Sequence, residues 1–201
     1  MNPDIYSIGL FIDGGYYCKI NDGLRPMRLR MNLKKLSNYI CRQIAARYDL
    51  LPDQCLITES HFFRGRFRMP DAKRKGQLEA DRAFEDALIK NDVIFHYKHI
   101  SELEDGVVRE KGIDVWFALE TYELALYRDF DFIVLITGDA DHEMLARKLK
   151  ALKKQVVLVN WNLGEGTSTA PALQEEVTMH VSLDEQARED AALPEAVCDM
   201  I

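Results

Sequence analysis

Long hydrophobic runs, clustered cysteines and an excess of basic residues are all missing from this chain of 201 residues. Its longest apolar runs, near residues 133–136 and 156–159, are too short to cross a membrane. The first residues also lack the basic and apolar pattern of a leader. From these features we expect a cytoplasmic protein.

The cysteines and the charge balance exclude further classes. Cys18, Cys41, Cys55 and Cys198 form no CxxC pair and have no histidines at zinc-site spacing, so reduced thiols are favoured over a zinc site. A formal net charge of −7 argues against a protein that coats nucleic acid through net charge, although a local basic patch can still bind it. The hydrophobic content of 47% is typical of a globular domain.

Strand and helix patterns alternate along the chain. Short apolar runs predict five strands, at residues 5–12, 55–63, 93–97, 132–136 and 155–160. Helical spacing of apolar residues predicts helices that begin near residues 32, 77, 113, 143 and 171. This alternation predicts an α/β fold with a mainly parallel sheet of about five strands, in one domain over residues 1–183. Residues 184–201 form an acidic, alanine-rich tail, to which we assign no elements.

The most informative stretch is FIVLITGDADHE at residues 132–143, a buried strand that stops at a glycine turn before a helix. It delivers Asp139 and Asp141 to the carboxyl end of the strand, and Asp13 follows the first strand in the same way. In parallel sheets these ends share one edge, where ligands bind. Asp114, in the first turn of the helix before residues 132–136, can lean over the same edge. If the two strands are neighbours, the acids meet.

Four carboxylates in one crevice repel one another unless cations bind between them. Oxygen ligands with open positions suit Mg²⁺ or Mn²⁺, and such sites activate water and stabilise the leaving oxygen in phosphodiester cleavage. The alternative is that each acid only caps a helix or complements its dipole. His142 lies beside the acids, where it is either a partly buried polar residue or a general base.

A basic loop is predicted at residues 64–75, RGRFRMPDAKRK, in an otherwise acidic chain. Its cations are Arg64, Arg66, Arg68, Lys73, Arg74 and Lys75, and phenylalanines are interleaved with them. Cations for phosphates and rings for base stacking are what single-stranded nucleic acid needs. The alternative is an ordinary solvated connection. Tyr16 and Tyr17, beside Asp13, either stack on a base or pack in the core.

Three segments together resemble the acidic motifs of the NYN domain, a branch of the PIN-like nucleases, and especially its bacterial LabA-like (DUF88) group: FIDGG at 11–15, KGIDVWFALE at 111–120 and LITGDADHEMLARKL at 135–149. The likeness covers residues 5–183. It implies a PIN-like three-layer α/β/α sandwich and a metal-dependent endoribonuclease. By the resemblance, Asp13, Asp114, Asp139 and Asp141 are the catalytic acids that hold Mg²⁺ or Mn²⁺, and Lys111 contacts a phosphate of the RNA.

The chain departs from the family pattern at two places. Tyr16 and Tyr17 stand where many members have asparagine, and His142 stands where many have phenylalanine. These changes leave the acids in place and bear mainly on substrate choice. The predicted partner is RNA in single-stranded or loop regions, and an exposed helix would also allow a homodimer.

Two other functions compete with the nuclease. One is a non-catalytic RNA-binding or adaptor module on a nuclease-like fold, which the tyrosine and histidine departures would suit. The other is a haloacid dehalogenase-like phosphohydrolase, which would need a second acid two positions after Asp13. Gly15 occupies that position, so this alternative is disfavoured.

Overall fold

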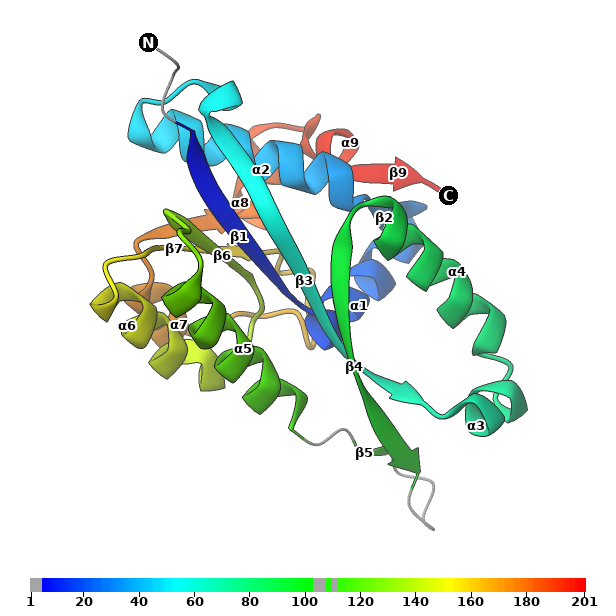
Figure 1. Cartoon of the computed structure of the whole chain (residues 1–201). Helices are drawn as coiled ribbons and strands as arrows, with labels where there is room; N and C mark the ends of the chain where they lie inside the picture. Colours follow the sequence, from blue (N-terminus) through cyan, green and yellow to red (C-terminus); the bar gives the residue numbers. More distant parts are fainter. Residues whose placement is uncertain (1–4, 103–107, 110–111) are drawn as a thin grey trace.

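A computed structural model describes residues 5–102, 108–109 and 112–201 of the chain (Figure 1). Its centre is a seven-stranded sheet in the order β5-β4-β3-β1-β6-β7-β8. The strands are β1 (Tyr6–Asp13), β3 (Cys55–Phe67), β4 (Val93–Glu102), β5 (Val108–Arg109), β6 (Phe132–Ile136), β7 (Gln155–Asn160) and β8 (Met179–Ser182). All neighbours are parallel except β4 and β5. The five predicted strands are therefore confirmed, and β5 and β8 add an edge strand on each side.

Helices cover both faces of the sheet (Figure 1). One layer holds α1 (Gly14–Leu24), α2 (Leu33–Tyr48), α4 (Leu78–Lys90), α8 (Leu183–Glu189) and α9 (Leu193–Val197). The other holds α5 (Ile113–Tyr127), α6 (Glu143–Ala151) and α7 (Pro171–Glu176). Successive side chains of β1 point to opposite faces of the sheet, so that Leu10 and Ile12 face the first helix layer while Phe11 faces the second. The core therefore consists of two clusters, one on each face of the sheet. The predicted three-layer architecture is confirmed.

Two segments differ from the sequence prediction. Helix α1 follows β1 directly and was not predicted. Its sequence begins with two glycines and has polar residues in its middle, so the helical pattern of apolar residues is weak. The tail forms α8, α9 and strand β9 (Cys198–Met200), which pairs with β2 (Leu29–Met31). Its apolar residues Leu193 and Val197 are buried, and the backbone of Asn32 donates to the Val197 carbonyl at 2.9 Å. Long-range packing therefore orders a segment whose composition alone predicted no elements.

The shorter elements complete the connections. They are the short helices α3 (Met69–Arg74), η1 (Arg25–Met27), η2 (Pro52–Gln54) and η3 (Ala140–His142). None of the helices in the described part of the chain is long and apolar enough to cross a membrane.

Strands β3 and β4 run past the edge at which β1 ends. Asp13 at the end of β1 pairs with Phe63, whereas the next four residues of β3, Arg64 to Phe67, pair only with residues 97–100 of β4. We call these two paired segments the β3–β4 extension. At a rise of roughly 3.3 Å per residue, four residues carry it about 13 Å beyond Asp13. The predicted basic loop at residues 64–75 is thus wrong as a loop, since it consists of the end of β3 followed by α3.

Candidate active site

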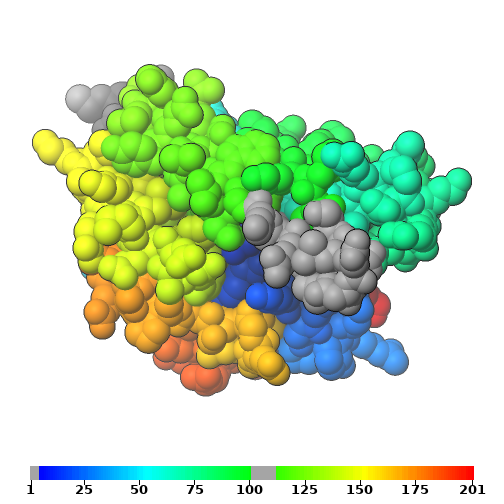
Figure 2. Space-filling model, turned by 90° about the horizontal axis from the view of Figure 1, so that it is seen from below, coloured from blue at the N-terminus to red at the C-terminus, as the bar shows by residue number. Residues whose placement is uncertain are grey.

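The acidic edge of the sheet is formed where β1 and β6 end side by side. Ile12 pairs with Ile136, so that Asp13 and Thr137 leave the sheet together, as the sequence predicted for neighbouring strands. The Thr137 hydroxyl donates to Asp13 Oδ2 at 3.2 Å and accepts from the Asp139 backbone N–H at 3.2 Å. One fully buried hydroxyl therefore joins the first acid to the turn that carries the other two. Viewed from this edge, blue atoms of the N-terminal part of the chain lie between the green and yellow atoms of later segments (Figure 2).

Helix capping fixes the direction of two acids. Asp13 is the N-cap of α1 and accepts from the Tyr16 backbone N–H at 3.1 Å. Asp139 is the N-cap of η3 and accepts from the Asp141 backbone N–H at 3.0 Å. The capping interpretation of these acids is correct, but it does not compete with a catalytic one, because a cap leaves carboxylate lone pairs to accept further bonds.

Asp114 and Asp141 are more open than Asp13. Asp114 is exposed in the first turn of α5, as predicted, and Asp141 is exposed in η3. A negative charge in the first turn of a helix is stabilised by the helix dipole, so both positions accept an ionised carboxylate.

A buried histidine brings the four acids into one electrostatic unit. His142 is 1% exposed and packs against Phe117 with ring centroids 4.5 Å apart. Burial lowers the pKa of His142, and each of the four acids opposes that shift. Asp13, Asp139, Asp114 and Asp141 thus all act electrostatically on this ring. Neither ring nitrogen has a hydrogen-bond partner among the described residues, which marks an unsatisfied polar group at the site.

The carboxyl group of Asp13 has a raised pKa. Burial raises the pKa of its carboxyl, and the neighbouring Asp114 adds to the rise. The Tyr16 amide, His142 and Thr137 act in the opposite direction. A carboxylate held this way is stabilised by a cation placed against it.

The fit to a metal ion is partial. Among the described residues, no three acidic, histidine or cysteine side chains stand together closely enough to enclose a metal. Asp13 already uses both oxygens in hydrogen bonds, and Asp139 uses one. Mg²⁺, however, keeps several waters and is commonly held through one or two carboxylates. The donors therefore fit a hydrated divalent cation, whereas the predicted four-ligand set is not assembled in this arrangement.

Sequence reasoning missed two polar residues of the edge. Thr137 was not singled out, although a hydroxyl directly after an apolar strand was a usable signal. Lys98 lies in the β3–β4 extension, and a Cβ placed on Gly112 would be 2.7 Å from its ammonium nitrogen. Gly112 has a φ of 75° and opens α5, so the lysine reaches the head of the helix that carries Asp114. The predicted phosphate contact, Lys111, lies outside the described residues.

The predicted RNA-binding cations are spread over the β3–β4 extension and α3. Arg64 lies over the Phe84 ring at 5.9 Å, Arg66 pairs with Glu85 and covers the Tyr97 ring at 5.4 Å, and Lys75 lies over Phe67 at 5.1 Å. Arg68 and Lys73 are exposed, and Arg74 makes an exposed ion pair with Asp71 at 3.2 Å. The structure thus places these cations beside the acidic edge but not on it.

Tyr16 does not offer a face to a base. The residue is 4% exposed, its hydroxyl donates to the Thr167 carbonyl at 2.9 Å, and it accepts from the Trp161 N–H at 3.2 Å. Tyr17 is equally buried and donates to the Met31 carbonyl at 3.0 Å. Of the two interpretations given for these tyrosines, core packing is correct, and Tyr16 leaves the set of candidate RNA contacts.

Comparison with known proteins agrees with this fold. The sequence matches the family profile of the NYN domain over residues 7–184. The chain belongs to the NYN domain family. NYN domains have a PIN-like nuclease fold, and members of that superfamily are generally nucleases that hydrolyse nucleic acid and use divalent metals.

A solved structure supports the fold of this NYN domain independently. A protein of unknown function from Vibrio parahaemolyticus RIMD 2210633 is similar to the chain at a TM-score of 0.61 with 18% sequence identity. The similarity covers 92% of this chain and 97% of the other. None of the curated proteins compared with the chain matches it.

Proposed function

We propose that this NYN domain is a metal-dependent endoribonuclease of the LabA-like (DUF88) group that cuts single-stranded or loop RNA. The observation that carries the proposal is the junction of Asp13 and Asp139 through Thr137 at the edge where β1 and β6 end, with Asp114 and Asp141 acting on the same buried histidine. Acids at this edge of a parallel sheet stand where ligands bind. Two observations support a site that takes up a further group: burial raises the pKa of Asp13, and the ring nitrogens of His142 have no partner among the described residues.

Each residue of the edge has a distinct role in this proposal. Asp13 and Asp139 hold the cation, because their carboxylates are aimed by capping bonds and by Thr137. Asp114 and Asp141, both exposed, accept bonds from its waters or orient the attacking water. When bound, Mg²⁺ or Mn²⁺ supplies activation of water and neutralisation of charge at the scissile phosphate.

The RNA strand reaches the acids along the β3–β4 extension. Lys98, beside Gly112, is placed to contact a phosphate next to the acidic edge. Arg64, Arg66, Arg68, Lys73, Arg74 and Lys75 provide further phosphate contacts along the extension and α3. The separation of cations from acids keeps the positive side chains from neutralising the carboxylates that the metal needs.

A non-catalytic RNA-binding module is the second candidate. It is favoured by one observation, namely that no three potential ligands among the described residues stand together as a metal-binding group. In that case the basic extension would bind RNA and the acids would serve only as helix caps.

Cleavage of a labelled mixed-sequence RNA decides between the two functions. Wild-type protein is incubated with Mn²⁺, with Mg²⁺ or with EDTA, next to Asp114→Asn and the control Asp53→Asn. Asp53 is exposed in η2, which precedes β3 and therefore lies at the opposite edge of the sheet. The nuclease predicts metal-dependent cleavage that Asp114→Asn reduces and Asp53→Asn preserves. RNA that stays intact with every metal, while a gel shift shows binding, would assign the protein to the second candidate.

A further inference from the structure

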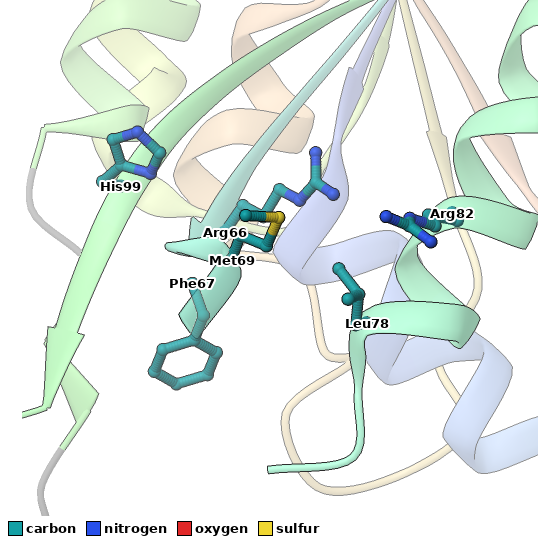
Figure 3. A pocket seen from close by; sticks show the side chains of 6 residues that line it. All are labelled: Arg66, Phe67, Met69, Leu78, Arg82 and His99. Carbon is teal, nitrogen blue, oxygen red and sulfur yellow. The ribbon is translucent and has the colours of Figure 1, made fainter. Parts of the chain in front are cut away.

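A cavity of about 290 Å³ lies beside the β3–β4 extension, away from the acids. It is lined by Arg66, Phe67, Met69, Leu78, Arg82 and His99. Figure 3 shows Arg66 and Phe67 at the end of β3, His99 on β4, and Leu78 and Arg82 on α4 around the cavity. Four elements that follow one another in the sequence, β3, α3, α4 and β4, therefore build one small space that is partly open to solvent.

The lining combines apolar walls with cations. Phe67, Met69 and Leu78 supply the apolar part. Met69 is 64% exposed, since little of the described structure covers it. Arg66, Arg82 and His99 supply nitrogen donors, and none of the six lining residues is acidic. An aromatic ring, aliphatic side chains and guanidinium groups are what a nucleobase and its phosphate require.

The two arginines of the cavity differ in how firmly their side chains are held. Arg66 is held by its ion pair with Glu85 and by the Tyr97 ring, so its guanidinium is pre-positioned. Arg82 is exposed, and its pair with the exposed Glu79, at 3.4 Å, is weak because water screens both groups. Arg82 can therefore turn towards an incoming phosphate at little cost.

The second cavity of the chain has a different character. It has about 330 Å³ and lies over the amino-terminal half of the sheet between α2 and the end of α4. Its lining includes Lys34 and Lys90 but also Glu59 and Asp92, so it selects no sign of charge. Of these two cavities, the one on the extension combines positive charge with an aromatic residue.

We propose that the cavity on the β3–β4 extension is a subsite for one nucleotide of the RNA strand. Its base packs against Met69 and Leu78 above the Phe67 ring, which is 9% exposed, while Arg82 and Arg66 hold the adjoining phosphate. The identity of the strand rests on the proposed ribonuclease function. Since the extension carries the subsite about 13 Å beyond Asp13, the anchored nucleotide is separated from the scissile bond by the intervening backbone of the strand. The subsite thus sets which position of a strand is cut.

The test measures binding without metal, so that it does not depend on cleavage. Fluorescence anisotropy in EDTA follows labelled decamers of uridine and of adenosine binding to the full chain. Arg82→Glu is expected to weaken binding about tenfold or more, because it removes one phosphate contact and places a negative charge there. The matched control is Arg42→Glu on α2, an equally exposed arginine far from the cavity, which is expected to change binding less than about twofold.

A second variant and a crosslink test the apolar wall. Met69→Ser, at an exposed position, is expected to weaken binding several-fold without loss of folded protein. A decamer carrying 4-thiouridine is expected to crosslink to the peptide that contains Phe67 and Met69. Equal effects of Arg82→Glu and Arg42→Glu, or crosslinks only outside residues 66–99, would overturn the subsite.

Free nucleotides give the remaining arm. UMP and AMP are expected to displace the decamers only at far higher concentration, because a strand makes many contacts that one nucleotide lacks. Displacement at equal concentration would overturn the strand subsite in favour of a free-nucleotide pocket. If the wild-type protein binds the decamers as expected but cleaves no RNA with any metal, the nuclease proposal is wrong and the subsite proposal is retained.

Discussion

The acidic edge and the β3–β4 extension differ in how their charged groups are held. At the edge, Asp13 and Asp139 are aimed by backbone N–H groups and by Thr137. On the extension, Arg66 is held by the side chains of Glu85 and Tyr97, and Lys75, at the end of α3, lies over the Phe67 ring. Backbone bonds fix a position closely, whereas exposed side-chain pairs such as Arg74 with Asp71 adapt at small cost. Under the proposed function, the fixed edge suits chemistry at one bond, and the more adaptable cations suit binding of varied strands.

The largest effect is expected from a substitution that removes a carboxylate charge at the edge, together with one of the two acceptor oxygens of Asp13. Asp13→Asn should lower the cleavage rate about 100-fold or more, since stabilisation of transition-state charge by a cation is worth several kcal/mol. Asparagine caps helices about as well as aspartate, so the thermal midpoint should stay within a few degrees. Rates are measured with labelled RNA and Mn²⁺, and melting is followed by circular dichroism. Unchanged cleavage would remove Asp13 from the active site.

The contact between the two regions is tested at Gly14. A Cβ on Gly14 would lie 2.5 Å from the Phe63 carbonyl oxygen and 2.9 Å from Arg64 Cβ, where the extension begins. Gly14→Ala should therefore destabilise the protein by about 1–3 kcal/mol, because β3 must move away from α1. The measurement is urea unfolding.

Gly23→Ala is the control for this change. It lies in the same helix, and the atoms nearest to its Cβ would belong to the Leu163 side chain, at 3.1 Å, which must shift by only a few tenths of an ångström. Replacing a glycine inside a helix by alanine contributes up to about 1 kcal/mol of stability. Equal stability of the two variants would show that the extension is not packed tightly against the start of α1.

A moderate effect is expected where the extension meets the edge. Lys98→Ala should weaken RNA binding several-fold at all sequences and reduce the slope of log K against log salt by about one, as expected for one lost phosphate contact. Lys90→Ala, at the end of α4 that precedes β4, is the control and should leave the slope unchanged. Binding is measured in EDTA at several salt concentrations. A normal salt slope for Lys98→Ala would mean that the strand does not pass this lysine.

The smallest effect concerns a histidine pair inside the sheet, below the extension. His61 Nδ1 and His96 Nε2 are 3.0 Å apart, and burial lowers the pKa of both rings. Glu59 and Glu120 oppose the shift at His61, while Arg128 adds to it. Groups with a depressed pKa when folded bind protons more readily when unfolded. Stability should thus be full above about pH 6.5, the unfolded pKa, and fall as the pH drops below it.

His96→Phe isolates this contribution. The phenyl ring preserves the stacking on Phe63, where the ring centroids are 4.3 Å apart, and removes one titrating group. Thermal midpoints of wild type and variant between pH 7.5 and 5.5 should show a shallower fall for the variant. An identical fall would place the pH dependence elsewhere, for example at His142 or His180, whose pKa values are also lowered by burial.

Much of the fold followed from local patterns. Buried parallel strands are nearly all apolar, so the sequence alone predicted the strands at Phe132–Ile136 and Gln155–Asn160. Asn32, a residue that favours the N-cap position, predicted the start of α2. Helix α1 was missed because its sequence opens with Gly14 and Gly15, and its helicity depends on the Asp13 cap and on burial of Tyr16 and Tyr17. Tertiary packing decided that segment, and it decided the tail as well.

The site was predictable only in part. That Asp13 and Asp139 share an edge follows from strand topology, which alternation of strands and helices indicates. The burial of Tyr16 could not be read, because an aromatic residue beside an acid suits both a core and a binding surface. The reach of β3 to Phe67 was hidden because basic residues at strand positions resemble a loop. The cavity beside the extension forms only because β3 continues to Phe67, so it could not be predicted from the sequence either.

The central claim is that the acidic edge cuts the strand that the extension binds. The most direct test is single-turnover cleavage by Asp139→Asn, with Mn²⁺ and enough protein to saturate the labelled RNA. The substitution keeps the N-cap of η3 and removes one carboxylate charge. The account predicts a rate at least about 100-fold below wild type with binding in EDTA unchanged. Cleavage by Asp139→Asn at the wild-type rate would contradict it.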